Sequence, residues 1–224
     1  FEHFAPDGVV LIPPLTDDPV VLEFLEAHDV AFACIAPKHP GGRIGVMLDE
    51  TAAVRELIAG LVAQGHRRIG HIKGPPAHGA CQWRFKGYRD ALRKAGIEYD
   101  EDLVVQGAFS FESGIEGGNR LLDLKRPPTA IFAANDDMAA GVIRAACERG
   151  LVVPRDISVC GFDDTPIARH IYPALTTVRQ PTSDMGRLAT MQLLARIRAA
   201  DAGGMVHVEH EVLFRESTQP PVRH

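Results

Sequence analysis

The sequence predicts an α/β fold built from parallel sheets with helices on both faces. Short continuous apolar runs alternate along the chain with longer segments that carry apolar residues at helical spacing. A continuous apolar run is typical of a strand buried on both faces. Regular alternation of strand and helix indicates a parallel sheet, because each helix carries the chain back to start the next strand. Polar and acidic residues follow several strands, where open α/β sheets bind ligands.

The predicted strands are short, and several end at a glycine or a proline. The first, Gly8 to Ile12, stops at Pro13-Pro14. The run after Leu175 stops at Gln180-Pro181, so that strand must leave its sheet there. A strand tip that carries acids, followed by a strand that leaves its sheet, indicates a cleft between two lobes. In chain order the expected strands are 8–12, 30–35, 43–48, 68–72, 103–106, 129–133, 157–162, 176–178 and 206–214.

The predicted helices have capping residues at their starts and glycines at several of their ends. Thr16-Asp17-Asp18 offers an N-cap, and Pro19 fits the first helical turn. Ser110 with Ser113 forms a second cap region, and Asn135-Asp136-Asp137 a third. The expected helices run from Pro19 to about 28, 50–64, 80–95, from the Ser110 region to about 124, from the Asn135 region to 150, and 183–200.

The first lobe has only about two strands before Arg43. A two-stranded parallel sheet offers too small a core to be stable alone. We therefore expect that a preceding strand–helix segment of this lobe is missing, removed or disordered.

Composition favours a soluble cytoplasmic protein that has no membrane segment and does not itself bind nucleic acid. The 224 residues are 46% hydrophobic and 24% charged, with a net charge of −5. The basic residues are scattered, whereas binding to phosphates needs a concentrated basic footprint. No apolar run approaches the ~18 residues that span a bilayer, and the first residues lack the basic region of a signal peptide. Four widely spaced cysteines are expected to be reduced core thiols: Cys34, Cys81, Cys147 and Cys160.

Five residues near the ends of predicted strands are candidates for ligand binding. Acids and an amide hydrogen-bond to hydroxyl groups, an arginine donates in a fork, and an aromatic ring covers the apolar face of a sugar. The mixture therefore predicts a polyhydroxylated ligand. The candidates are Arg84, Phe109, Asn135, Asp163 and Gln180.

Four of the five candidates also have an alternative that involves no ligand, whereas Asp163 is less easily explained in this way. Asn135 with Asp136 is the expected helix cap, and Asp164 could cap the short segment that follows it. Arg84 could be an ordinary surface charge and Phe109 a core residue. Gln180 could satisfy backbone groups where the chain crosses between lobes.

No enzyme motif is present, and we expect no catalytic residue, cofactor or metal. The chain has no nucleophile elbow, P-loop or zinc-protease motif, and Gly41 to Gly45 has the wrong spacing for a dinucleotide site. His66 is interpreted as a structural linker between a helix and a strand. The neighbouring acids of the pairs Asp136/Asp137 and Asp163/Asp164 would point to opposite faces of a strand, so their spacing does not indicate an acid/base pair.

The chain resembles the effector-binding domain of LacI/GalR-family (lac repressor-type) transcriptional regulators. The matching motifs cover nearly the whole chain in the expected order: Asp7-Gly8-Val9-Val10-Leu11, 61–69, Gly74-Pro75-Pro76 with 84–88, 128–139, 154–159, Gly161-Phe162-Asp163-Asp164 and 175–181.

This resemblance implies a periplasmic-binding-protein-like fold, in which two Rossmann-like lobes with parallel sheets are joined by three crossovers near 47–50, 178–181 and 206–210. The implied N-terminal lobe, whose first part is absent, comprises 1–48 and 180–208. The C-terminal lobe comprises 49–179 and 209–216, and 217–224 reads as a polar tail.

The resemblance also implies that Arg84, Asn135, Asp163 and Gln180 contact a small effector between the lobes, with Phe109 as the stacking ring and Asp49 as a weaker candidate. The effector would be sugar-like, and the protein a homodimer that binds operator DNA only through an N-terminal helix-turn-helix absent from these residues. The main alternative is a periplasmic sugar receptor of a transport system, which the cysteines and residues 176–181 disfavour. A sugar-processing enzyme is a weaker alternative.

Overall fold

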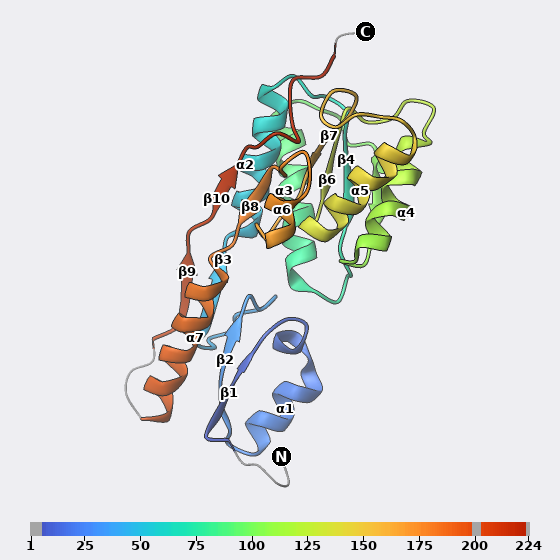
Figure 1. Cartoon of the computed structure of the whole chain (residues 1–224). Helices are drawn as coiled ribbons and strands as arrows, with labels where there is room; N and C mark the ends of the chain where they lie inside the picture. Colours follow the sequence, from blue (N-terminus) through green and yellow to red (C-terminus); the bar gives the residue numbers. More distant parts are fainter. Residues whose placement is uncertain (1–5, 199–202, 223–224) are drawn as a thin grey trace. The chain divides into compact units, whose positions relative to one another are not determined.

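The computed structural model describes residues 6–198 and 203–222, and it divides the chain into two compact units. The first unit combines 1–49, 77–80 and 181–209, and the second combines 50–76, 81–180 and 210–224. The chain passes between them at 49/50, 180/181 and 209/210, and residues 77–80 make a further brief excursion into the first unit. Each unit is an α/β layer structure (Figure 1).

The first unit has a four-stranded parallel sheet in the order β1-β2-β3-β9. Alternate residues of β2 face opposite sides: Ala33 packs against α7, whereas Cys34 packs against α1. This alternation explains why the strands are apolar on both faces. The elements are β1 (Gly8–Leu11), the 3-10 helix η1 (Leu15–Asp17), α1 (Pro19–Ala27), β2 (Ala31–Ile35), β3 (Gly45–Leu48), α7 (Thr182–Ile197) and β9 (Met205–Val208).

The second unit has a four-stranded parallel sheet in the order β5-β4-β6-β7. Helices α4 and α5 cover one face and α3 covers the other (Figure 1). The elements are α2 (Glu50–Ala63), β4 (Ile69–Lys73), α3 (Gly79–Lys94), η2 (Glu101–Leu103), β5 (Val104–Gln106), α4 (Phe111–Leu122), β6 (Ala130–Ala133), α5 (Asp136–Glu148), β7 (Ser158–Cys160), α6 (Pro166–His170), β8 (Thr177–Arg179) and β10 (Glu211–Leu213).

The α/β class, the parallel sheets and the order of elements are confirmed, and most boundaries lie within two residues of those predicted. The caps are also present. Asp18 accepts hydrogen bonds from the backbone of Val20 and Val21, and Ser110 and Ser113 cap each other's backbone. The last predicted helix extends to 200, but 199 and 200 lie outside the described residues. Cys34, Cys81 and Cys160 are buried as predicted, whereas Cys147, near the end of α5, is exposed, so the prediction that it is a core residue was wrong.

The single strand predicted over 206–214 is instead two strands. β9 pairs in parallel with β3 in the first unit, and β10 pairs antiparallel with β8 in the second. The chain passes between units after Glu209, so one continuous strand cannot serve both sheets.

The C-terminal segment differs from the predicted polar tail over residues 217–222. Ser217 is fully buried and exchanges hydrogen bonds with the backbone of Val159. The carbonyl oxygen of Gln219 accepts from Ser158 Oγ at 3.1 Å and lies 2.9 Å from His66 Nε2. The polar side chains that suggested a tail instead satisfy backbone groups at the edge of β7. His66 therefore has a structural role, and burial lowers its pKa. Residues 223 and 224 lie outside the described part.

Helices α4 and α5 approach each other through glycines. A Cβ atom on Gly114 would overlap the backbone of Met138, and one on Gly141 would overlap the carbonyl oxygen of Phe111. The packing therefore requires residues without side chains at both positions.

We predict that Gly114→Ala lowers the free energy of unfolding by about 1–3 kcal/mol, because the added methyl group forces the two helices apart. Gly186→Ala in α7 is the matched control, since no heavy atom lies within 4 Å of the added Cβ. It should leave stability unchanged or raise it by up to about 1 kcal/mol through helix propensity. Urea unfolding followed by circular dichroism measures both, and equal effects would contradict this account of the contact.

Candidate functional site

Four polar residues and one aromatic residue gather at the carboxyl-end rim of the sheet in the second unit. Phe109 follows β5, Asn135 follows β6 and Asp163 follows β7. Arg84 lies on α3, the helix that follows β4, and Gln180 follows β8. Because β5 and β6 flank β4 on opposite sides, the strand order reverses at this rim. Ligands of open α/β sheets bind at such a reversal.

Arg84 is buried at the centre of this group, with a relative exposure of 4%. Its Nε donates to Glu50 Oε2 at 2.7 Å, Nη1 donates to the Ala134 carbonyl, and Nη2 lies 3.4 Å from Asp163 Oδ1. The Phe162 ring covers the guanidinium, with its centroid 3.7 Å away. Burial opposes the charged form, but Glu50 and Asp163 outweigh it and raise the pKa of Arg84. The guanidinium is therefore charged and held in a fixed orientation.

Asp163 occupies a backbone conformation that is rare for an L-residue, with φ of 117°. Its Oδ1 accepts a hydrogen bond from Gln180 Nε2 at 2.6 Å, in addition to the contact with Arg84. No donor among residues 6–198 and 203–222 reaches its Oδ2, and the side chain is 22% exposed. Burial raises the pKa of this carboxyl, while Arg84 and Gln180 act in the opposite direction. Arg84 and Gln180 thus orient the carboxylate through Oδ1, while Oδ2 is available to a ligand.

Asn135 and Phe109 are joined by a hydrogen bond from the Asn135 Nδ2 amide to the Phe109 carbonyl at 3.1 Å. Asn135 Oδ1 also accepts from the backbone of Met138, so the predicted capping role is present. The Phe109 ring centroid lies 5.9 Å from the guanidinium carbon of Arg84. The ring also packs on the hydrophobic core, as the alternative interpretation of Phe109 predicted. Phe109 therefore contacts both the core and the polar group around Arg84.

The second unit therefore brings together five of the six candidates: Arg84, Phe109, Asn135, Asp163 and Gln180. Asp49, the sixth, belongs to the first unit. Arg84 is not an ordinary surface charge, because it is buried and paired with acids.

Glu50 is the residue of this group that the sequence analysis did not identify. It is 4% exposed and makes the shortest ion pair of Arg84. Its position at the first residue of α2 suggested only an ordinary acid in a first helical turn. No local pattern marks it, because its partner is 34 residues away in the chain.

Asp136 is fully buried and has a structural role. Its carboxylate accepts from Thr177 Oγ1 at 2.6 Å and from the Thr165 backbone at 2.8 Å, which ties the start of α5 to β8. Burial raises the pKa of this carboxyl to about 7, against the effect of these hydrogen bonds.

Asp164 does not cap the segment that follows it, contrary to that interpretation. Thr165 occupies the N-cap position of α6 and makes no capping bond through its side chain. Asp164 instead accepts from Arg169 and Arg179, both at 2.8 Å, and from Arg215 at 2.6 Å. Burial would raise the pKa of this carboxyl, but the three arginines lower it to about 2. These three ion pairs stabilise the turn after β7 in which Asp163 lies.

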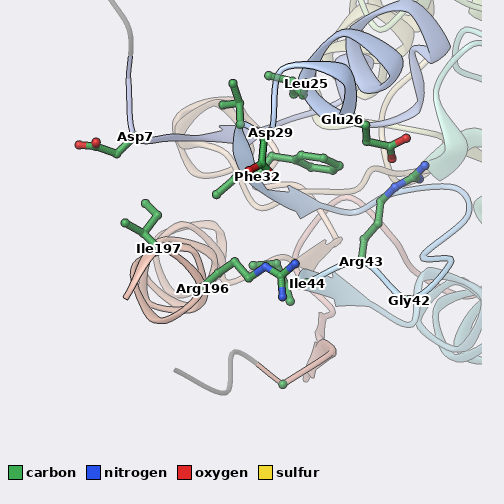
Figure 2. A pocket seen from close by; sticks show the side chains of 13 residues that line it. Asp7, Leu25, Glu26, Asp29, Phe32, Gly42, Arg43, Ile44, Arg196 and Ile197 are labelled. Atoms are coloured by element: carbon green, nitrogen blue, oxygen red, sulfur yellow. The ribbon is translucent and has the colours of Figure 1, made fainter. Parts of the chain in front are cut away.

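The first unit has a separate hollow of about 760 Å³ at the amino ends of its strands (Figure 2). Arginines and acids both line it, so it has no strong preference for ligand charge: Asp7, Glu26, Asp29, Arg43 and Arg196. Its location is opposite to the carboxyl-end rim where open α/β sheets bind ligands.

Within the described ranges, His, Cys, Asp and Glu side chains nowhere gather as a group of three suited to a metal ion. No helix in the described part of the chain is both long and apolar enough to cross a membrane.

Comparison with known proteins gives consistent matches. The profile of a periplasmic binding protein-like domain matches residues 58–218. The chain is 39% identical over 175 residues to the HTH-type transcriptional repressor CytR of Escherichia coli K12, covering 78% of this chain and 51% of CytR. It therefore spans about half the length of that relative.

Two solved structures are also similar. The transcriptional regulator CelR in complex with cellobiose is 36% identical with a TM-score of 0.88, and the match covers 94% of this chain and 65% of that one. A LacI-family regulatory protein from Chloroflexus aggregans is 31% identical with a TM-score of 0.86, and the match covers 95% and 76% of the two chains.

We predict that Asp164→Asn lowers the free energy of unfolding by about 2 kcal/mol at pH 7. The folded-state pKa of Asp164 lies below its unfolded value near 4. Its contribution is therefore complete above about pH 4 and is lost as the pH falls towards 2. Chemical unfolding at several pH values should show the difference from wild type shrinking over that window. Asp123→Asn, at an acid that is 69% exposed, is the control. A difference that is constant with pH would contradict the ionic role of Asp164.

Proposed function

Because the chain belongs to the periplasmic binding protein-like domain family, in the form found in LacI-family regulators, we propose that it is the effector-sensing and dimerisation module of a transcriptional repressor. The effector is a small sugar or a sugar derivative. The observation that carries this proposal is the Asp163 carboxylate, which Arg84 and Gln180 orient while its Oδ2 accepts no hydrogen bond from the described residues.

The chemistry of the rim supports a neutral, hydroxyl-rich ligand. The carboxylate of Asp163, whose side chain is 22% exposed, accepts hydrogen bonds from sugar hydroxyls, and the neighbouring amides can share others. Glu50 and Asp163 together outnumber the single cation Arg84, so the group disfavours an anionic ligand. Phe109 supplies an aromatic ring beside these groups that can cover the apolar face of a sugar. The cellobiose complex of CelR supports the same class of ligand.

Control of transcription requires that the effector bind two conformations unequally. In the proposed mechanism, the chain acts as a homodimer in the cytoplasm, and its effector shifts the conformational equilibrium of a helix-turn-helix segment outside these residues. Operator contact through such a segment fits the net charge of −5 and the scattered positions of the basic residues in the sequence, because binding to DNA needs a concentrated basic footprint. The chain binds its ligand without turning it over.

A thermal-shift panel on the purified protein tests the ligand class, using neutral mono- and disaccharides that include cellobiose, together with sugar acids and nucleobases. A ligand at about 100 times its dissociation constant adds about 2.7 kcal/mol of stability. For this chain length that raises the melting temperature by roughly 5–10 °C. We expect neutral sugars to produce such a shift. A folded protein that no sugar stabilises contradicts the proposed class.

We predict that Asp163→Asn weakens sugar binding by about 1–3 kcal/mol, because the ligand loses a charged acceptor while the shape of the side chain is kept. Asp123→Asn is the matched control, and it should bind as wild type does. Isothermal titration calorimetry measures both, with circular dichroism to verify folding. A folded Asp163→Asn protein with unchanged affinity would rule out this site.

A further inference from the structure

The outer face of α3, together with the segment that follows this helix, forms a groove in the second unit. Its volume is about 740 Å³, within the usual range for small-molecule sites. Phe85 and Tyr99 line it with aromatic rings in an edge-to-face arrangement, their centroids 6.3 Å apart. Tyr99 is 41% exposed, so part of its ring is open to a ligand.

Two cations lie over these rings. The Arg89 guanidinium carbon is 5.2 Å from the Tyr99 centroid and 5.8 Å from that of Phe85, and Lys73 Nζ is 5.3 Å from the Phe85 centroid. Within the described part of the chain, neither cation has a carboxylate partner or a side-chain hydrogen bond. By contrast, Lys86 and Arg93 on the same helix are both paired with Asp90.

This difference matters chemically. An aromatic ring holds a guanidinium through its flat face, which leaves the N–H groups in the plane of the guanidinium without acceptors. Those N–H groups form the fork that matches a phosphate or a carboxylate. Arg89 is thus held in position by Phe85 and Tyr99, while its donors remain available.

A neighbouring hollow limits the size of the anion that this groove can accept. Glu98 and Tyr99 line both spaces, and the second space is lined otherwise by one arginine and three further acids. Arg68, the arginine, is already paired with Asp100. The acids of this second space would therefore repel an extended acidic peptide where the peptide left the groove. A compact anion would bind beside Arg89 without reaching them.

We propose that this groove binds a compact aromatic anion, that is, a planar ring carrying a phosphate or carboxylate group. The ring packs against Phe85 and Tyr99, and the anionic group binds Arg89, which lines the groove with them. This site is separate from the rim proposed for the sugar: Arg84 contacts Glu50 and Asp163, whereas the next residue, Phe85, contacts the aromatic cluster.

Phenyl phosphate, phenol and inorganic phosphate form a matched set of probes, since the last two each carry one half of the first. Nuclear magnetic resonance titration of the purified protein measures their dissociation constants and locates the shifts. We expect phenyl phosphate to bind at least about tenfold more tightly than either fragment, because ring and charge act together. Signals of Phe85, Arg89 and Tyr99 should move. Equal affinities for the three probes, or shifts confined to other residues, would overturn the proposal.

Two methionine variants of α3 separate a specific site from general attraction to a basic helix. Arg89→Met should weaken phenyl phosphate binding about tenfold, since it removes the charged fork and keeps the length of the side chain. Arg93→Met removes an equal charge from another residue that lines the groove, but this side chain is 82% exposed and already paired with Asp90. Its loss should therefore change affinity less than threefold. Equal losses in the two variants would indicate general attraction and contradict the site. Asp163→Asn should leave phenyl phosphate binding unchanged, so the outcome does not depend on the sugar site.

Discussion

The buried guanidinium of Arg84 is the interaction on which the site depends. Removing a charge from water costs several kcal/mol unless partners surround it. Here the partners come from three places: Glu50 at the start of α2, the Ala134 carbonyl after β6 and Asp163 after β7. The requirement to neutralise one cation therefore fixes the ends of three elements relative to α3. Because these contacts lie within the second unit, that unit positions the rim by its own packing.

The two adjacent acids at the tip of β7 have different tasks. Both have positive φ values, 117° and 56°, which ordinary residues rarely adopt. Asp164 is bound by three arginines that lower its pKa to about 2, and it holds the turn. Asp163 has a partly exposed side chain whose Oδ2 accepts no hydrogen bond from the described residues, and burial raises the pKa of this carboxyl. A rigid turn thus presents a carboxylate whose remaining hydrogen-bonding capacity is available to a ligand.

Local patterns predicted the strands, the helices and the positions of Arg84, Asp163 and Gln180, because residues that follow parallel strands meet at one edge whatever the details of packing. What the sequence could not predict depends on contacts between distant residues. Glu50 looked like a helix-terminal acid, and its role follows only from meeting Arg84. Ser217 looked like part of a solvated tail, yet it is buried against β7 because the edge of that strand needs hydrogen-bond partners. Local spacing contains neither relation.

The central claim, that the Asp163 carboxylate binds the hydroxyl groups of a sugar, is tested most directly by observing that carboxylate. Carbon-13 nuclear magnetic resonance of carboxyl-labelled aspartate reports the environment of each side chain, and Asp163→Asn assigns the signal. Titration with the sugar that stabilises the protein best, beginning with cellobiose, should shift the Asp163 signal and lower its pKa, because donated hydrogen bonds favour the ionised form. The exposed Asp123 should not respond. A sugar that saturates the protein while the Asp163 signal and its titration stay unchanged would contradict the account.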